Sequence, residues 1–502
     1  MAANALDVQQ QAIEVTGQNI ANVDTPNYSR EQIQLQTSTP LATTLGQQGT
    51  GVTATGIEQI RSSLLDSQIP GGISSLSYYN TKSDLMTQVQ TSLDQPLSSL
   101  NSLSSTSATS TSGGLTDDIN NFFSAYQSLS TDPTSSVLRQ QVVSSAQIVA
   151  TALNTIGNSL ITTQTQIGTD VTTAVNAANT ILANIASLNQ QISSVEVGGT
   201  TKANDLRDQR QQLVETLSQT FDISTHEESN GSLTVRLGSA QGGTLLVSGN
   251  YSGNTASATT VKLAVNGSAP TMALEGWTGG VAETVGNLTA VTQPSAGTVA
   301  AQLNVINSVI GDGTTGLVQN YDNIAAGLAN LVDTVHQTGF TLQGSPAYNT
   351  AGSASFFDND NIPGNALGTV TARNIQLNSA IAADPTQIAA SDTAGQPLNG
   401  NLAQTIADLK SNTTAPQLGG QTVSNYYLNT LTSLAANIQS TTNQGSTQQL
   451  VNQQLSQQRD SVQGVSLDQE TSNLMIYQHA YEASARLMST IDSMMQTLIQ
   501  IQ

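Results

Sequence analysis

The final stretch of the chain, residues 464–502, has no proline and no glycine after Gly464. Its apolar residues recur at alternating steps of three and four, interrupted only by Ser484, and this spacing predicts one long amphipathic helix with a heptad stripe. The members of this first stripe are Leu474, Tyr477, Tyr481, Met488, Ile491, Met495 and Leu498. A second stripe runs beside it through Ile476, Ala480, Ala483, Leu487, Met494 and Ile501.

Together the two stripes cover roughly half of the helix circumference, at about 100° per residue. A single partner helix would hide only one narrow stripe. Amphipathic helices more often pack into the core of their own chain, but this helix is terminal and its apolar arc is wide. We therefore expect neighbouring copies of the chain to cover part of it, and the sequence predicts a self-assembling protein.

Composition limits the partners that such a chain can have. Charged residues are only 9% of the 502 residues and aromatic residues only 4%, against about 25% charged in average globular proteins. We therefore expect seams between long helical rods to contribute more stability than one thick core. The net charge of −21 argues against nucleic acid and against anionic membrane surfaces, because both attract basic proteins.

Targeting and redox signals are sparse. No window approaches the roughly 18 apolar residues of a membrane span, so we expect no membrane insertion. The first residues lack the basic start and apolar run of a cleavable signal peptide. The sequence contains no cysteine, which excludes disulfides and thiolate metal sites.

The pattern along the chain predicts a mainly α fold with a β-rich insert. The long terminal helices form a coiled-coil or bundle rod, and a small β domain occupies the middle of the chain. Five segments are expected: 1–60, an N-terminal assembly helix and extended segment that pairs with the C-terminus; 61–220, the first half of a helical rod; 221–295, a small β-rich outer domain; 296–400, a return helix and loop-rich piece; and 401–502, the second half of the rod with the C-terminal assembly helix.

Local signals refine this outline. Helices are expected over 1–23, from a break at Pro70-Gly71-Gly72, from Ile119 to a stop at Asp132-Pro133, through 171–195, over 299–336, and from about Leu402 to the end with an interruption near Pro416. Strands are expected within 28–60 and at 232–237, 244–247 and 260–267, and loops at 101–114 and through much of 338–400.

Several segments resemble a known family. Residues 16–30, Thr-Gly-Gln-Asn-Ile-Ala-Asn-Val-Asp-Thr-Pro-Asn-Tyr-Ser-Arg, are similar to the N-terminal signature of flagellar rod, hook and hook-associated proteins. Residues 464–486 and four internal segments (204–210, 335–339, 356–357 and 384–391) resemble the hook-associated members. The resemblance spans nearly the whole chain in the expected order. It also implies that family members carry further residues ahead of the position of Ala3.

The resemblance implies a structural component of the bacterial flagellum that joins hook to filament as a ring of identical subunits. Such proteins are extracellular and leave the cell unfolded through the flagellar export apparatus, without a cleavable signal peptide. The implied partners are the hook protein, a second junction protein, the flagellin filament and an export chaperone. The alternatives are a hook or distal-rod protein, or a secreted enzyme or adhesin on an axial scaffold. We also expect the terminal segments to order only on assembly, because neighbours must offset the entropy of ordering.

Assembly contacts are expected at both ends of the chain. The candidate residues are Asn19, Ile20, Asn22, Pro26 and Tyr28 near the N-terminus, and Leu467, Leu474, Tyr477, Tyr481, Leu487, Met488, Ile491, Met495 and Leu498 near the C-terminus. For the N-terminal group, local helix capping and contact between subunits are equally plausible from the sequence.

No enzymatic, cofactor or metal site is predicted. The three histidines, His226, His336 and His479, lie far apart in sequence, and His226-Glu227-Glu228 is expected to form a charged turn before a strand. The run Asp358-Asn-Asp-Asn361 is similar to a calcium loop, but Ile362-Pro363 and Thr369 occupy positions where that loop needs ligands and glycine. We expect a surface turn there.

Overall fold

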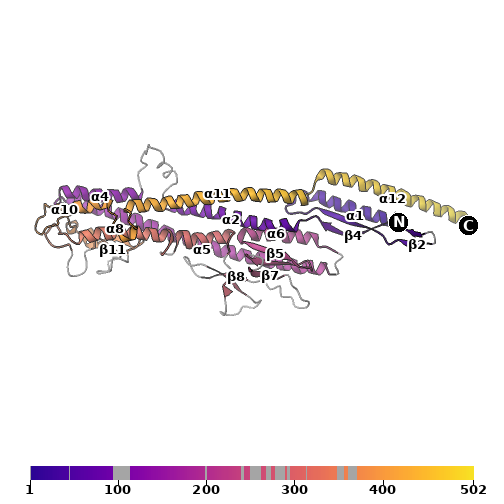
Figure 1. The fold of residues 1–502 in the computed structure, drawn as a ribbon, viewed down its shortest axis with the longest axis horizontal. Helices are drawn as coiled ribbons and strands as arrows, with labels where there is room; N and C mark the ends of the chain where they lie inside the picture. Colours follow the sequence, from indigo (N-terminus) through magenta and orange to yellow (C-terminus); the bar gives the residue numbers. More distant parts are fainter. Residues whose placement is uncertain are drawn as a thin grey trace.

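The protein is an elongated helical bundle with both chain ends toward the same end, where the C-terminus lies at the tip and the N-terminus lies short of it (Figure 1). The computed structural model describes residues 2–43, 46–93, 114–197, 201–238, 242–248, 262–266, 273–277, 289–290, 294–311, 314–347, 355–359 and 370–501. None of the helices in these ranges is long and apolar enough to cross a membrane.

Long helices form the body. They are α2 (Ser63–Ser92), α4 (Leu115–Thr131), α5 (Ser136–Val195), α6 (Asn204–Thr220), α8 (Gly316–His336) and α11 (Val423–Gln463). Helix α2 packs along α11, and α5 packs against both α4 and α6. The predicted rod through 171–195 is confirmed as the second half of α5, where Val171, Val175, Ala178 and Leu182 are buried. The 3-4 spacing forms a helix here because each turn returns an apolar side chain to the same seam.

A smaller set of elements completes the body. They are α7 (Thr298–Asn304), α9 (Ser379–Ala383), α10 (Asn401–Asp408) and the 3-10 turns Pro385–Gln387, Leu409–Ser411 and Pro416–Leu418. Strand β11 (Phe357–Asn359) pairs antiparallel with β12 (Ile375–Leu377) inside the predicted loop-rich piece. Asp358 and Asn359 therefore lie in a strand and not in the expected surface turn, while residues 360–369 lie outside the described residues.

The middle of the chain forms two antiparallel three-stranded sheets. The first has the order β5 (Ile223–Glu227), β6 (Leu233–Leu237), β7 (Thr244–Val247); the second has the order β10 (Thr289–Ala290), β9 (Ala273–Trp277), β8 (Lys262–Asn266). The predicted strands at 232–237 and 244–247 are confirmed, with Val235 and Leu237 buried where the alternation requires. His226 and Glu227 belong to β5, opposite Thr234 and Leu233, so the predicted turn starts too early.

The two ends of the chain build a separate group of elements, which we call the terminal module. It consists of α1 (Ala2–Ala21), β1 (Glu31–Thr37), β2 (Leu41–Thr43), β3 (Gly46–Gln48), β4 (Val52–Gln59) and α12 (Leu467–Ile501). Helix α1 packs against α12 on one side and against β1 and β4 on the other. The predicted pairing of the two chain ends is present.

Two predicted helix boundaries are wrong because tertiary packing overrides the local signal. Helix α2 runs straight through Pro70-Gly71-Gly72 from Ser63, although an internal proline costs about 3 kcal/mol. Gly72 has no side chain, so α2 can approach Asn452 and Leu455 of α11 closely. This close packing offsets the backbone hydrogen bond that Pro70 cannot make. The helix predicted over 464–502 also starts later than expected. Residues Gly464 to Ser466 are not helical, and α12 begins at Leu467.

The predicted helix over 299–336 is also interrupted. After α7 the chain forms a π-helical turn at Val305–Ile310 and then breaks, because Gly311 and Gly316 adopt the positive φ angles 82° and 77° that other residues avoid. Gln164 of α5, fully buried, donates from Nε2 to the carbonyl oxygens of Ile306 (3.2 Å) and Gly311 (2.8 Å) and stabilises the break. The predicted loop at 101–114 lies outside the described residues except for Gly114.

Candidate assembly interface

Helix α12 has a covered side and an open side. Three residues of the first stripe, Leu474, Tyr477 and Met488, are half-buried, so the part of this stripe between 474 and 488 lies toward α1. The two helices run antiparallel, since their outer ends both lie toward the same end of the molecule (Figure 1). On its own side α1 buries Val8 and Ala12. The covered seam is thus narrow, one stripe against one helix.

The large residues of the second stripe between 476 and 494 stay in solvent, while Ala480 is half-buried. Ile476, Leu487 and Met494 are 59%, 53% and 57% exposed. From Ser489 to residue 500 every side chain of α12 is exposed, including the first-stripe residues Ile491, Met495 and Leu498. Tyr481 and Leu467 are exposed as well. Contiguous apolar surface of this kind on a soluble chain marks an interaction site.

Asn19 holds the turn that follows α1. Its Nδ2 donates to the Glu31 carbonyl oxygen (2.9 Å) and to Glu470 Oε2 (3.3 Å), and its Oδ1 accepts from Tyr28 Oη and from the Glu31 amide (both 2.9 Å). Asn19 is fully buried, so its hydrogen-bonding groups are used inside the chain. Burial, followed by the nearby Glu31, raises the pKa of Tyr28, which therefore stays a neutral donor.

The other N-terminal candidates have mixed surroundings. Asn22 Nδ2 donates to the Gln18 carbonyl oxygen (3.1 Å) and its Oδ1 accepts from Thr25 Oγ1 (3.1 Å), which ends the helix locally. Ile20 is half-buried and Pro26 is exposed. The structure thus brings Asn19, Asn22 and Tyr28 together as a capping group, and leaves Pro26 apart from their hydrogen bonds.

An ion pair fixes the start of α12, and sequence reasoning missed it. Arg30 Nε donates to Glu470 Oε1 at 2.7 Å, and the Glu470 side chain is only 2% exposed. The Arg30 amide also donates to the carbonyl oxygen of Gln463, the last residue of α11 (3.0 Å). A carboxylate in the first turn of a helix is favourable there, but that signal gives no indication of its distant partner.

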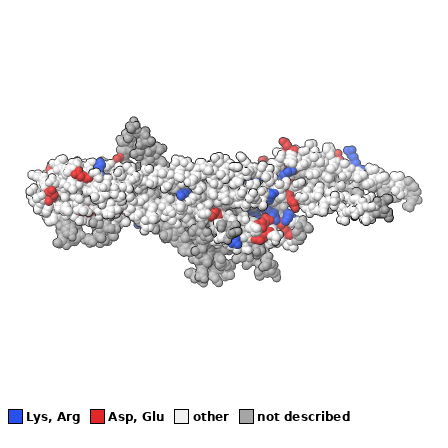
Figure 2. Space-filling model, in the orientation of Figure 1, with Lys and Arg blue, Asp and Glu red and all other residues white. Residues whose placement is uncertain are grey.

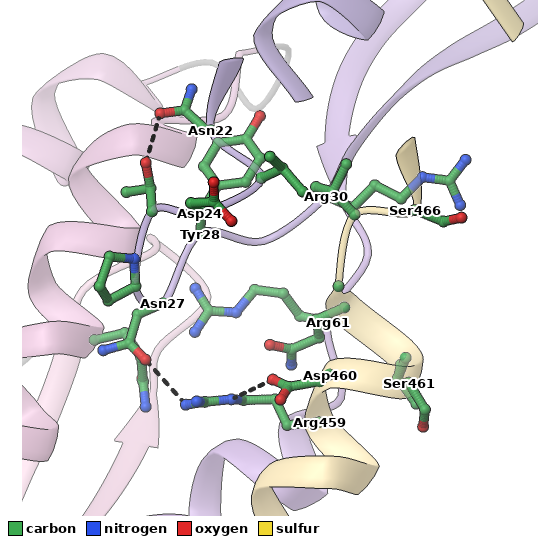
Figure 3. Close-up of a pocket in the computed structure, with 18 of the residues that line it drawn as sticks. Asn22, Asp24, Asn27, Tyr28, Arg30, Arg61, Arg459, Asp460, Ser461 and Ser466 are labelled. Carbon is green, nitrogen blue, oxygen red and sulfur yellow. Dashed lines mark hydrogen bonds and ion pairs between the residues drawn. The ribbon is translucent and has the colours of Figure 1, made fainter. Parts of the chain in front are cut away.

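A cleft of about 660 Å³ lies where the terminal module meets the body, between the turn after α1 and the end of α11 (Figure 3). Arg459 lines this cleft and donates from Nη1 to Asn27 Oδ1 (3.0 Å) and to Glu215 Oε1 (2.8 Å). Arg61 pairs with Asp66 (3.1 Å) and more weakly with Asp208 (3.4 Å). The guanidinium groups at the cleft already have acidic partners. We therefore interpret the cleft as a polar joint between the terminal module and the body and not as a ligand site.

Charges gather around this joint while much of the visible surface is neutral (Figure 2). Beside it Arg207 donates to both carboxylate oxygens of Glu196 (2.8 and 2.9 Å) and also to Glu227. Burial acts to raise the pKa of Glu196, but the hydrogen bonds from Arg207 prevail and lower it. Glu196 therefore remains ionised and holds α6 to the end of α5.

The described residues contain no group of three metal-ligating side chains. His226 lies in β5, and His479 is exposed on α12. His336 is buried at the end of α8, where Nε2 accepts from the Ala389 amide (3.0 Å), as a core histidine does.

Comparisons with known proteins agree along the chain. Residues 97–354 match the family model for the flagellar hook-associated protein FlgK helical domain. Residues 456–501 match the flagellar basal body rod FlgEFG protein C-terminal model, and residues 1–28 match the flagella basal body rod protein model.

Two relatives are similar over almost their whole length. Flagellar hook-associated protein 1 of Bacillus subtilis (strain 168) is 27% identical over 529 residues, covering 99% of this chain and 96% of the relative. The protein of the same name from Escherichia coli (strain K12) is 22% identical, covering 100% of this chain and 98% of the relative. The solved structure of the flagellar hook junction protein FlgK from Burkholderia pseudomallei has the same fold, with a TM-score of 0.61 at 15% identity over 79% of this chain and 100% of that one.

Proposed function

Because this chain belongs to the flagellar hook-associated protein FlgK family, we propose that the exposed apolar surface of α12 is the seam through which subunits join. This surface combines the second stripe with Leu467 and the exposed residues of the first stripe. The chain has a structural role at the junction between flagellar hook and filament. The open side of α12 is the observation that carries the proposal. Apolar side chains that are about half exposed in one subunit gain roughly 25 cal/mol per Å² when a neighbour covers them.

The seam that we propose consists of exposed residues from both stripes and Leu467: Ile476, Leu487 and Met494 of the second stripe, and Tyr481, Ile491, Met495 and Leu498 of the first. Leu474, Tyr477 and Met488 take a different part, since they face α1 and align α12 before neighbours arrive. Asn19, Asn22 and Tyr28 set the turn between α1 and β1, and exposed Pro26 is left for contact between subunits. We propose that identical subunits form a ring through this seam, since head-to-tail contacts whose rotation closes make a ring.

The partners of the assembled ring are other flagellar proteins, as for the family. More specifically, we propose hook protein on one side, with a second junction protein and the flagellin filament on the other. Export through the flagellar apparatus with a chaperone, and no cleaved signal peptide, completes the proposal. We propose no enzymatic activity, since self-assembly needs only matching surfaces.

The decisive experiment is a deletion of the gene in the native bacterium. We expect cells that still build hooks but release filament protein into the medium, because nothing joins the two. Immunoblotting of medium and electron microscopy of cell surfaces measure both. A strain that lacks hooks altogether would instead indicate a hook or rod protein, and one with intact filaments would reject a junction role.

Amide hydrogen exchange of the isolated chain tests how much of the seam forms before assembly. The packing of α12 on α1 within one chain changes the expectation that both terminal segments order only on assembly. We now expect slow exchange between Leu467 and Met488, where Glu470 and the first stripe contact α1 and Arg30, and fast exchange from Ser489 onward, where all side chains are exposed. The second region should become protected in assembled rings. Equal, slow exchange along all of α12 in the isolated chain would contradict this division.

A further inference from the structure

The terminal module is joined to the body by two short connections that have no helical structure, residues 60–62 between β4 and α2 and residues 464–466 between α11 and α12. Such connections can bend, because a few residues at the ends of elements absorb most hinge motions. Contacts across the joint must therefore set the angle between module and body, and the hydrogen bond from the Arg30 amide to the Gln463 carbonyl oxygen is one of them. The candidates are the polar residues of α6, which belong to the body.

One face of α6 supplies these contacts. Asn204, Asp208 and Glu215 are separated by four and seven positions, so they lie on one side of the helix. All three are shielded from solvent to a large degree, and all three meet residues at the joint. Polar side chains on a helix usually face water, so a polar face turned toward another part of the chain has a specific use.

Asn204 bridges both long strands of the module. Its Nδ2 donates to Glu31 Oε1 of β1 (2.8 Å) and to the Ile57 carbonyl oxygen of β4 (3.3 Å), and its own carbonyl oxygen accepts from Gln59 Nε2 (3.1 Å). Glu31 is 7% exposed, so this contact lies away from solvent. Loss of Asn204 would leave the Glu31 carboxyl buried without that donor.

One turn further along α6, Asp208 Oδ2 accepts from the Ser29 amide (3.2 Å) and Oδ1 from Arg61 Nη1 (3.4 Å). At the far end of the same face, Glu215 pairs with Arg459, which also donates to Asn27. The turn that follows α1 is thus held at Asn27, Ser29 and Glu31 in succession. The contacts at Ser29 and Glu31 come from α6 itself, and the contact at Asn27 comes from Arg459 of α11, which Glu215 of α6 holds by an ion pair. Because the three contacts are spread along the turn, together they resist rotation as well as separation.

We propose that Asn204, Asp208 and Glu215 form a latch that fixes the angle of the terminal module to the body in the free subunit. The latch aims the second stripe of α12 before any neighbour binds, which lowers the ordering cost of assembly. This inference extends the proposed function, since the stripe needs aiming only if it is a seam. The latch itself exists in a single chain and is measurable there.

The sequence allows a direct measurement, because it contains no cysteine. Gln454→Cys on α11 and His479→Cys on α12 place spin labels at two exposed positions on either side of the bend. The labels lie no more than about 45 Å apart by the reach of two helical segments and a short extended one. Pulsed electron paramagnetic resonance on the full chain then gives their distance distribution.

The labelled native sequence should give one narrow peak. Asn204→Ala with Asp208→Ala should shift that peak or replace it with a broad distribution, at unchanged helix content by circular dichroism. Gln212→Ala with Thr216→Ala, on exposed positions of the same helix, is the matched control and should preserve the narrow peak. If the double latch variant does not fold, Asn204→Ala and Asp208→Ala are measured singly.

A native-like narrow peak in every folded latch variant would overturn the latch. The spin-label distances test the latch independently of the assembly experiment that tests the seam. Subunits that assemble normally with Leu487→Asp would reject the seam and leave the latch in place, whereas an unchanged distance with blocked assembly would do the reverse.

Discussion

Leu487→Asp is expected to abolish assembly while the single chain keeps its fold. The residue is 53% exposed in the subunit, so its replacement should change the free energy of unfolding by no more than about 0.5 kcal/mol. In a seam the new charge would be buried without a partner, which costs several kcal/mol. A cost of about 3 kcal/mol weakens each subunit contact more than a hundredfold.

Complementation of a deletion strain measures this effect through filament protein released into the medium, and thermal unfolding of the purified variant checks the fold. Ser489→Asp is the matched control, since it adds the same charge to the polar face of the same helix. Met488→Asp should also block assembly, but it loosens the contact of α12 with α1 as well. Full complementation by Leu487→Asp would show that the second stripe is not the seam.

Asp333→Asn is expected to remove most of the pH dependence that the Asp333 carboxyl gives to the free energy of unfolding. Asp333 of α8 is fully buried, and its Oδ1 accepts from the amides of Phe356 (2.6 Å) and Phe357 (3.0 Å). Burial raises the pKa of this carboxyl from 3.8 to about 8. The folded state thus holds the proton more tightly than the unfolded state does. Its stabilising contribution is complete below pH 3.8 and is lost as the pH rises through about 8.

Over that window the native protein should lose about 1.4 kcal/mol per pH unit through this group. Asparagine has the shape of the protonated acid and does not titrate. The free energy of unfolding of the variant should therefore increase relative to that of the native chain as the pH rises from 5 to 8. Urea unfolding at several pH values measures the difference. Asp408→Asn, at an exposed position of α10, is the matched control for the substitution itself. A constant difference for Asp333→Asn would refute the prediction.

Periodic apolar spacing predicted the long helices well, because burial repeats with every turn. The second half of α5, over 171–195, and the amphipathic character of α1 and α12 follow from that signal alone. Pro70 was misleading, because the signal for a break is local, whereas the packing of α2 on α11 that overrides it joins residues far apart in sequence. The predicted domain boundaries at 60, 220, 295 and 400 stay predictions.

The contacts of the joint could not be read from the sequence for a related reason. Asn19 and Glu470 are 451 positions apart, and no pattern in either segment names the other as a partner. The polar face of α6 gives the same signal as an ordinary solvated face until the turn at Ser29 is placed against it. The spacing of apolar residues predicts that they will be buried. The sequence gives no corresponding signal for the partners of buried polar residues.

The pairing of α1 with α12 has a consequence for how errors in synthesis are handled. Translation makes α1 first and α12 last, and neither the covered seam nor the Arg30–Glu470 pair exists until both are present. A polypeptide that terminates early has no α12 to offer and leaves the apolar side of α1 bare. If subunits join through the proposed seam on α12, incorporation would select for subunits that have been translated to the end of α12, because a chain without α12 has no seam.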